Sequence, residues 1–247
     1  MFSFLDTTIL STAVLIDGAY FIKRFRSIDP SNSYNPQRAA DMAFEWACAH
    51  LSQDPSEFLD KSFLTSSANQ MKFQSKLYRI FFYDCPPLEK RLHNPVSGRC
   101  VDFSKSDEAV FRRKLHELLG RKRKVILRLG HLSKDVQWTI RPEKIAKIMK
   151  NQASIVQLEE CDVLPKLRQK GVDMRIGVDL TSIVFKKLVD QIVLVAGDAD
   201  FVPAGKQARR EGIDFILDPM WRSVPEQLIE HVDGVRSTCP KPSGTRL

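Results

Sequence analysis

Four short, mostly apolar runs constrain the fold of this chain more than any other feature. They are Ala13–Ile16, Tyr78–Tyr83, Ile192–Ala196 and Ile213–Leu217. Apolar side chains follow one another in these runs with little polar alternation, which is typical of parallel strands covered on both faces. The sequence therefore predicts a buried, mostly parallel central sheet.

Helical periodicity fills much of the sequence between these strands. It covers Pro36–Leu51, Val172–Val189 and Pro203–Glu211, with Pro36 at a first-turn position and Gly212 placed to end the last segment. Strands that alternate with helices indicate an α/β sandwich. The 247 residues suit one large domain or a domain with an insertion.

The segment 86–170 departs from this rhythm and is interpreted as a basic insertion or lid on a main domain that spans residues 1–235. It contains a basic helix near Asp107–Leu119, and Lys124–Leu129 with Val136–Ile140 are candidates for an antiparallel ribbon. The tail 236–247 has three basic residues, no acidic ones and two prolines, and it is expected to be flexible.

Composition excludes several classes of protein. The 43% hydrophobic content, with 15 phenylalanines, supplies core material that a disordered chain lacks. No apolar stretch approaches the roughly 20 residues of a membrane-spanning helix, and no basic residue precedes Lys23 as a secretory signal requires. The five cysteines form no CxxC pair, which argues against a thiolate zinc site and a disulfide framework. A cytoplasmic protein without a membrane partner is expected.

Aspartates follow three of the predicted strands. They are Asp17 after the first, Asp84 after the second, and Asp198 with Asp200 after the third. The carboxyl ends of parallel strands meet at one edge of an open sheet, where ligands bind. Asp173 stands at the start of a predicted helix and Asp179 six residues later, which is about 600° of rotation, so these two acids do not share a helix face.

A cluster of carboxylates repels itself unless a cation is held among them. Mg²⁺ or Mn²⁺ suits such a cluster, because hard divalent ions prefer oxygen ligands and retain several waters. An ion held there activates water and neutralises charge on a phosphodiester. Any one of these acids alone is better explained as a helix cap or turn residue. The combination of Ile16-Asp17-Gly18 with Gly197-Asp198-Ala199-Asp200-Phe201 favours a functional site.

Three motifs occur in a specific order. They are Val14-Leu15-Ile16-Asp17-Gly18, then Lys170-Gly171-Val172-Asp173 with Asp179, then Gly197-Asp198-Ala199-Asp200-Phe201-Val202-Pro203. From about Ala13 to about Asp233, the chain resembles the NYN domain family, in its bacterial LabA-like branch of the PIN-like nuclease superfamily. The resemblance implies a Rossmann-like, PIN-like three-layer sandwich and an acidic divalent-metal site that cuts RNA.

The resemblance assigns catalytic roles to five aspartates. The metal ligands would be Asp17, Asp179, Asp198 and Asp200, with Asp173 in support. Tyr20 stands where many family members carry asparagine, three residues after the first acid, and Ala199 stands where serine is frequent.

Other folds with acidic strand ends fit the sequence less well. A haloacid-dehalogenase-like enzyme needs a second aspartate where this chain has Ala19, and a Toprim domain needs glutamate where the first strand gives Asp17. The chain contains no Gly-x-Ser-x-Gly elbow, no GxGxxG and no Walker A loop.

Basic residues outnumber acidic ones by 38 to 30, and much of the excess is concentrated. Between Lys105 and Arg128, nine basic residues stand against three acidic ones. We interpret Arg121-Lys122-Arg123-Lys124 as a track for the phosphate backbone beside the acidic site, against the alternative of a solvated helix end. Further contacts to RNA are expected from Lys206, Arg209 and Arg210.

Two hypotheses of function follow from these features. The first is a metal-dependent ribonuclease that hydrolyses RNA phosphodiester bonds, with single-stranded RNA as the partner. The second is a catalytically weak or inactive NYN-type RNA-binding regulatory adaptor. The retained aspartates favour the enzyme, whereas Tyr20 favours the adaptor. The sequence leaves open whether the chain forms a homodimer.

Overall fold

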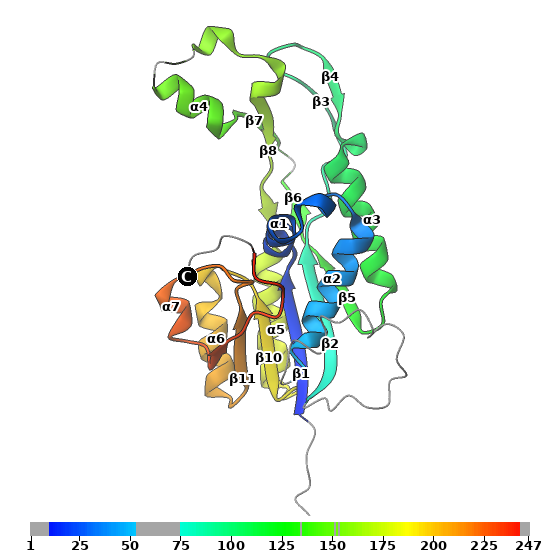
Figure 1. Cartoon of the computed structure of the whole chain (residues 1–247), viewed down its shortest axis with the longest axis vertical. Coiled ribbons are helices and arrows are strands. Elements are labelled where there is room, and N and C mark those ends of the chain that lie inside the picture. The colour runs from blue at the N-terminus through cyan, green and yellow to red at the C-terminus, as the bar shows by residue number, and fades with distance from the viewer. Residues whose placement is uncertain (1–9, 53–74, 134, 151, 153, 243–247) are drawn as a thin grey trace, which may run out of the picture.

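The centre of the molecule is a six-stranded parallel sheet (Figure 1). The computed structural model describes residues 10–52, 75–133, 135–150, 152 and 154–242. The sheet consists of β1 (Leu10–Asp17), β2 (Ser75–Asp84), β5 (Val125–Leu129), β10 (Gln191–Val195), β11 (Asp214–Asp218) and β12 (Gly234–Val235). Their order is β12-β11-β10-β1-β2-β5, with every neighbouring pair parallel. All four predicted strands are present, and the predicted α/β class is confirmed.

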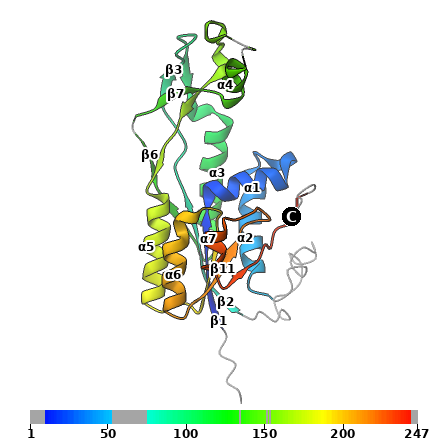
Figure 2. The ribbon, with the colours of Figure 1, turned by 90° about the vertical axis from the view of Figure 1, so that its left-hand side faces the viewer.

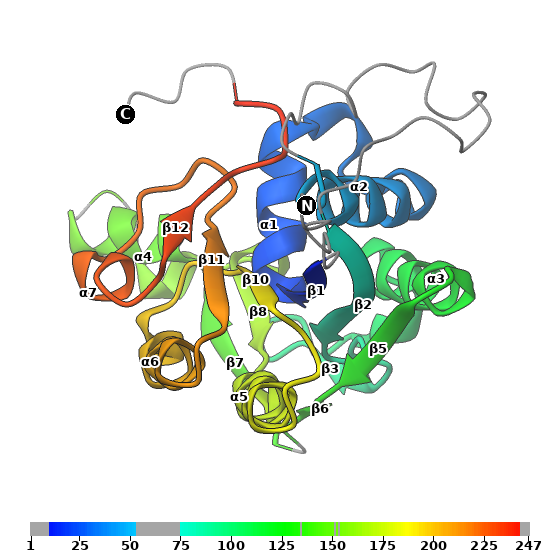
Figure 3. The ribbon, with the colours of Figure 1, turned by 90° about the horizontal axis from the view of Figure 1, so that it is seen from below.

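Alternate side chains of the central strands point into two cores, one on each face of the sheet. In β1, Ala13 and Leu15 join one core, while Val14 and Ile16 join the other. The first core is covered by α5 (Val172–Phe185), α6 (Val202–Arg210) and α7 (Glu226–Ile229). The second is covered by α1 (Gly18–Ile28), α2 (Pro36–Ala49) and α3 (Asp107–Arg121). Figure 3 shows the layers end-on, and they form the predicted Rossmann-like sandwich.

Helix α1 follows β1 without a loop, because Asp17 ends the strand and caps the helix. Its Oδ1 accepts hydrogen bonds from the backbone N–H groups of Ala19 (3.0 Å) and Tyr20 (3.2 Å). Gly18 is required at the junction, since a Cβ there would lie 2.5 Å from the carbonyl oxygen of Tyr83. The sequence did not predict this helix, although its cap is the most prominent aspartate of the chain.

A second lobe stands above the carboxyl ends of the sheet strands (Figure 1 and Figure 2). It contains β3 (Arg91–His93), β4 (Cys100–Asp102), β7 (Gln137–Ile140), β8 (Val163–Lys166) and α4 (Pro142–Met149). Strands β3 and β4 pair antiparallel, as do β7 and β8, and β6 (His131–Leu132) pairs with β9 (Gln169–Lys170) below them. Short 3₁₀ turns lie at Pro30–Asn32, Phe103–Lys105, Ile155–Gln157, Glu160–Asp162 and Ala199–Phe201. Among the described helices, none combines the length and apolar content needed to cross a membrane.

The predicted insertion over residues 86–170 was too broad, because part of it belongs to the central sandwich. Helix α3 packs against α2, and β5 extends the sheet beyond β2. The predicted ribbon between Lys124–Leu129 and Val136–Ile140 is therefore wrong: the first strand pairs with β2 and the second with β8. Apolar side chains on both faces of β5 pack against the two cores, which a two-stranded ribbon would not provide.

The C-terminal segment is anchored, which corrects the prediction of a flexible tail over residues 236–247. The buried Thr238 hydroxyl donates to the carbonyl oxygen of Trp46 (2.8 Å) and to Asp218 Oδ2 (3.4 Å). The same Asp218 oxygen accepts from His50 Nε2 (2.9 Å), so the segment is tied to α2 and to the end of β11. The last five residues of that prediction lie outside the described part of the chain.

Thr238→Val is expected to lower the free energy of unfolding by about 1–3 kcal/mol, because the Trp46 carbonyl and the Asp218 carboxylate lose a buried donor. Thr181→Val is a matched control, since Thr181 is only partly buried and donates within its own helix to the carbonyl of Gly177. Urea denaturation measures both variants. Equal midpoints for the two variants would contradict an anchoring role for Thr238.

Candidate active site

Aspartates from several elements gather at the carboxyl edge of the sheet. Those at strand ends are Asp17 of β1, Asp84 of β2 and Asp218 of β11. Asp198 and Asp200 lie in the loop after β10, and Asp173 lies in the first turn of α5. The parallel topology places all of these positions at one edge, as the sequence predicted for Asp17, Asp84, Asp198 and Asp200. Asp218 was not identified from the sequence.

Asp17 is the most strongly perturbed acid at this edge. Burial raises its pKa to about 6, hydrogen bonds from Tyr20 and Ala19 oppose the rise, and repulsion from Asp173 and Asp84 adds to it. Both backbone hydrogen bonds fall on Oδ1. Oδ2 is therefore the atom of Asp17 that can meet a ligand.

Asp173 links Asp17 to the pair of acids after β10. Partial desolvation raises the pKa of Asp173, and repulsion from Asp198 and then Asp200 raises it further. Asp198 Oδ1 accepts from the backbone N–H of Asp200 (3.2 Å), which caps the 3₁₀ turn. Four carboxylates thus form one electrostatically coupled group, which we call the acidic edge: Asp17, Asp173, Asp198 and Asp200.

Asp84 lies beside the acidic edge, but the guanidinium of Arg112 balances its charge. Its side chain is completely buried and accepts from Arg112 Nη1 and from His116 Nε2 (2.8 Å), both on α3. Asp84 follows its strand in the same way that Asp17 does, yet no local pattern indicates that Arg112 and His116 are its partners. A buried carboxylate that is hydrogen-bonded to a guanidinium and an imidazole has a structural role.

Asp179, a predicted metal ligand, is not brought to the acidic edge. Its Oδ2 accepts from the hydroxyl of Tyr83 (3.1 Å) and forms an ion pair with Arg128 Nε (3.0 Å). Burial raises the pKa of Tyr83 most, and the negative charge of Asp179 and the hydrogen bond to it raise it further, so the hydroxyl stays protonated as the donor. Arg128 on β5 thus balances the charge of Asp179 in this structure, and its role as a metal ligand stays a prediction.

Tyr20 connects α1 to the backbone that follows β10 and β11. Its hydroxyl donates to the carbonyl oxygen of Pro219 (2.6 Å), just after β11. Its ring lies against Gly197, where a Cβ would be 2.5 Å from a ring atom. The side chain that replaces the family asparagine thus sets the position of the backbone immediately before Asp198.

A pocket opens between α1 and the loops that follow β10 and β11. Its lining includes the acids Asp17 and Asp198, the ring of Tyr20, and two cations that the sequence analysis did not identify, Lys23 and Arg222. Asp173 and Asp200 line a neighbouring groove between α5 and α6. No sequence signal marked the two cations: Arg222 stands alone in its segment, and Lys23, next to Arg24, lies in a helix that the sequence did not predict.

The basic run Arg121-Lys122-Arg123-Lys124 lies at the opposite end of the sheet, which corrects its predicted place beside the acids. It precedes β5, and the register puts Arg128 level with Asp17. Lys124 therefore lies about 13 Å below Asp17 along the strand direction, beyond the screening length of about 8 Å. Arg121 pairs with Glu117, and Lys122 pairs with Asp41.

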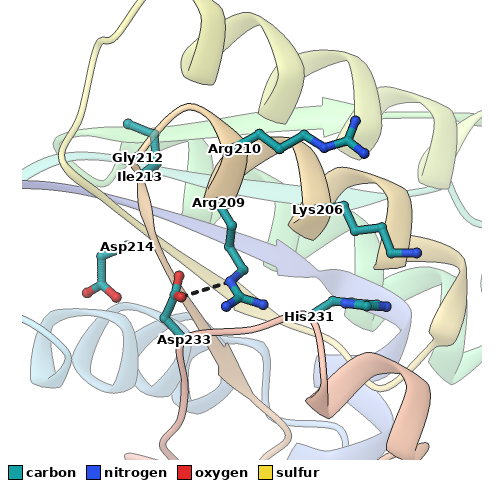
Figure 4. A pocket seen from close by; sticks show the side chains of 8 residues that line it. All are labelled: Lys206, Arg209, Arg210, Gly212, Ile213, Asp214, His231 and Asp233. Atoms are coloured by element: carbon teal, nitrogen blue, oxygen red, sulfur yellow. Dashed lines mark hydrogen bonds and ion pairs between the residues drawn. The ribbon is translucent and has the colours of Figure 1, made fainter.

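The basic residues of α6 also lie away from the acidic edge. Lys206, Arg209 and Arg210 line a pocket with Asp214, the first residue of β11, at the amino end of the sheet (Figure 4). Arg209 is held there by an ion pair with Asp233 (2.9 Å). These residues do not reach the acids, because α6 runs antiparallel to the strands.

Asp17→Asn should stabilise the metal-free protein at pH 8 by about 1–3 kcal/mol. The pKa of Asp17 is raised from 3.8 to about 6, so its stabilising contribution is complete below pH 4 and is lost as pH rises through 6. Asparagine keeps the helix cap. Thermal denaturation in EDTA at pH 8 and pH 4 measures the difference, which should vanish at pH 4.

Asp29→Asn provides a control of opposite sign. A hydrogen bond from Asn32 is the largest influence that holds the pKa of Asp29 below its usual value, so this variant should lose stability at pH 8. An Asp17→Asn protein less stable than the wild type at pH 8 would contradict the electrostatic account of the acidic edge.

Known proteins that are similar to this chain include one archaeal and one bacterial protein. An uncharacterized protein of Methanocaldococcus jannaschii is 32% identical over 71 residues, which are 28% of this chain and 30% of that protein. The match thus spans less than a third of the archaeal protein. The crystal structure of a protein of unknown function from Vibrio parahaemolyticus aligns with a TM-score of 0.41 and 14% identity, covering 95% of this chain and 94% of that one.

The NYN domain model matches residues 113–238, just over half of the chain. That range includes Asp173, Asp198 and Asp200, while Asp17 lies before it and joins them through the topology of the sheet. The predicted family is confirmed: this chain belongs to the NYN domain family.

Proposed function

We propose that this protein is a divalent-metal-dependent ribonuclease that hydrolyses phosphodiester bonds of single-stranded RNA at the acidic edge. The NYN domain is a PIN-like nuclease family, which supports nuclease chemistry in general. The observation that carries the proposal is the gathering of four carboxylates at one edge without a cationic partner among the described residues. Burial raises the pKa of Asp17 and of Asp173 most, and repulsion from neighbouring carboxylates raises both further. Unpaired like charges at a sheet edge are costly unless a cation compensates them.

The donor set of the acidic edge fits a hard divalent cation. All of its donors are carboxylate oxygens, the ligands that Mg²⁺ and Mn²⁺ prefer, and none of the four forms an ion pair with a described residue. Within the described ranges, no three His, Cys, Asp or Glu side chains are grouped tightly enough to enclose a metal. The ion would therefore be held by one or two carboxylates, Asp17 and Asp198 first, and would retain waters.

The protein's own residues prepare the site for such an ion. The N–H groups of Ala19 and Tyr20 hold Asp17 by Oδ1, and neither of these hydrogen bonds occupies Oδ2. Tyr20 supports the Gly197 backbone ahead of Asp198, and Asp173 adds negative potential from α5. When bound, a divalent ion lowers the pKa of a coordinated water and neutralises charge that develops on the phosphodiester.

A second candidate function is that of an inactive NYN-type RNA-binding adaptor. One observation favours it: the Tyr20 hydroxyl is already bonded to the Pro219 carbonyl, so the residue offers the site no amide that could orient water or a ligand. This function keeps the same fold and surface charge without turnover. Metal-dependent cleavage separates the two candidates.

Asp198→Asn is expected to reduce metal-dependent cleavage of labelled single-stranded RNA by at least about 100-fold, because the ion's stabilisation of the transition state is worth several kcal/mol. Incubation with Mn²⁺ or Mg²⁺, against EDTA, measures the rate. Mn²⁺ binding by calorimetry should weaken in the same variant.

Asp214→Asn is the matched control, because Asp214 stands at the amino end of β11, where its carboxylate accepts from Gln191 Nε2 (2.6 Å). It should cleave at the wild-type rate. RNA binding by a wild-type protein that cleaves with neither metal would favour the adaptor instead.

A further inference from the structure

We propose that Lys23 and Arg222 bind the phosphates of a polynucleotide chain and hold it across the pocket that contains Asp17 and Asp198. The inference rests on the proposed function and deepens it by naming the substrate contacts. It also replaces the basic residues predicted from sequence, which lie at the other end of the sheet.

The pocket joins two acids and two cations that do not neutralise one another. Lys23 comes from α1 and Arg222 from the loop after β11, and both side chains are exposed. Neither side chain forms a hydrogen bond or ion pair with any described residue, and neither reaches the carboxylates beside it. They are therefore available to a ligand.

Other cations at this edge are already engaged by the protein. Arg112 is paired with the buried Asp84, and Arg128 is paired with Asp179. Arg24 donates from Nε (3.1 Å) and Nη2 (2.6 Å) to the carbonyl oxygen of Met220. The contrast separates cations that stabilise the fold from the two that face the pocket.

The loop that carries Arg222 is held in a demanding backbone conformation. Met220 (φ 48°) and Trp221 (φ 62°) are consecutive non-glycine residues in the left-handed region, which costs free energy. The Trp221 backbone N–H donates to Ser237 Oγ (2.9 Å), and its indole Nε1 donates to the carbonyl of Cys239 (2.6 Å). The surrounding structure thus fixes the point from which Arg222 extends.

The charge arrangement selects a phosphodiester chain as the ligand. Asp17 and Asp198 repel phosphate, so a polyanion approaches them only where cations offset that repulsion. Lys23 and Arg222 supply two positive charges from two separate elements, which suits two phosphates of one chain better than a single phosphate. Contacts to phosphate read no base, so this binding is independent of sequence.

The experiment measures binding of a fluorescein-labelled 12-nucleotide oligouridylate to the full chain in EDTA, between 50 and 200 mM NaCl. The double variant Lys23→Gln, Arg222→Gln should lose two phosphate contacts, which makes the slope of log affinity against log salt shallower by about 1.4. Its affinity should then fall about 7-fold less than that of the wild type across this fourfold change in salt.

Lys206→Gln, Arg210→Gln is the charge-matched control, because both side chains are exposed and unpaired among the described residues, at the amino end of the sheet. It should keep the wild-type slope, and both double variants should keep the wild-type Tm. If the Lys23→Gln, Arg222→Gln variant keeps the wild-type slope while the wild-type protein cleaves RNA, this inference is wrong and the proposed function stands. A wild-type chain that neither binds nor cleaves the RNA would overturn the proposed function with it.

Discussion

The two hydrogen bonds from Ala19 and Tyr20 to Asp17 fix the arrangement of the carboxyl edge. Asp17 is the last residue of β1 and the N-cap of α1, so the helix begins at the carboxyl edge of the sheet without a loop. That start places Tyr20 against Gly197 and under the Pro219 carbonyl. The loops after β10 and β11, which carry Asp198 and Arg222, are therefore positioned by a side chain three residues beyond the first acid.

The acids at this edge fall into two groups according to how their charge is balanced. Asp84 and Asp218 are buried, and each has an imidazole on its carboxylate: His116 for Asp84 and His50 for Asp218. Such pairs specify geometry, because a buried carboxylate without a donor would be strongly destabilising. The acidic edge has no such partners among the described residues, and three of its four acids, Asp173, Asp198 and Asp200, are exposed to solvent. A cation can therefore reach it.

The strands and the acids at their ends could be predicted from the sequence, because both depend on patterns among residues that are close together in the chain. Continuous apolar runs predict buried parallel strands, and topology alone then brings Asp17 and Asp198 to one edge. The prediction from sequence failed where the structure depends on pairing between strands that are far apart in the chain. The residues before β5 read as a ribbon because nothing local shows that Val125 pairs with Ile80. Without that pairing, neither the remoteness of Lys124 nor the partnership of Arg128 with Asp179 can be inferred.

Positive charge is distributed so that a polyanion meets the carboxyl edge under attraction. The segments 86–106 and 130–171, which build the upper lobe and its base, hold twelve basic and seven acidic residues, a net charge of +5. The lobe stands over this edge (Figure 2), whereas the amino edge is about 23 Å away along β1. Because screening acts over about 8 Å, charge at the amino edge does not act on a chain at the acidic edge, and the attraction must come from the side of the lobe. The lobe therefore supplies diffuse attraction, and the geometry of the pocket must supply the orientation.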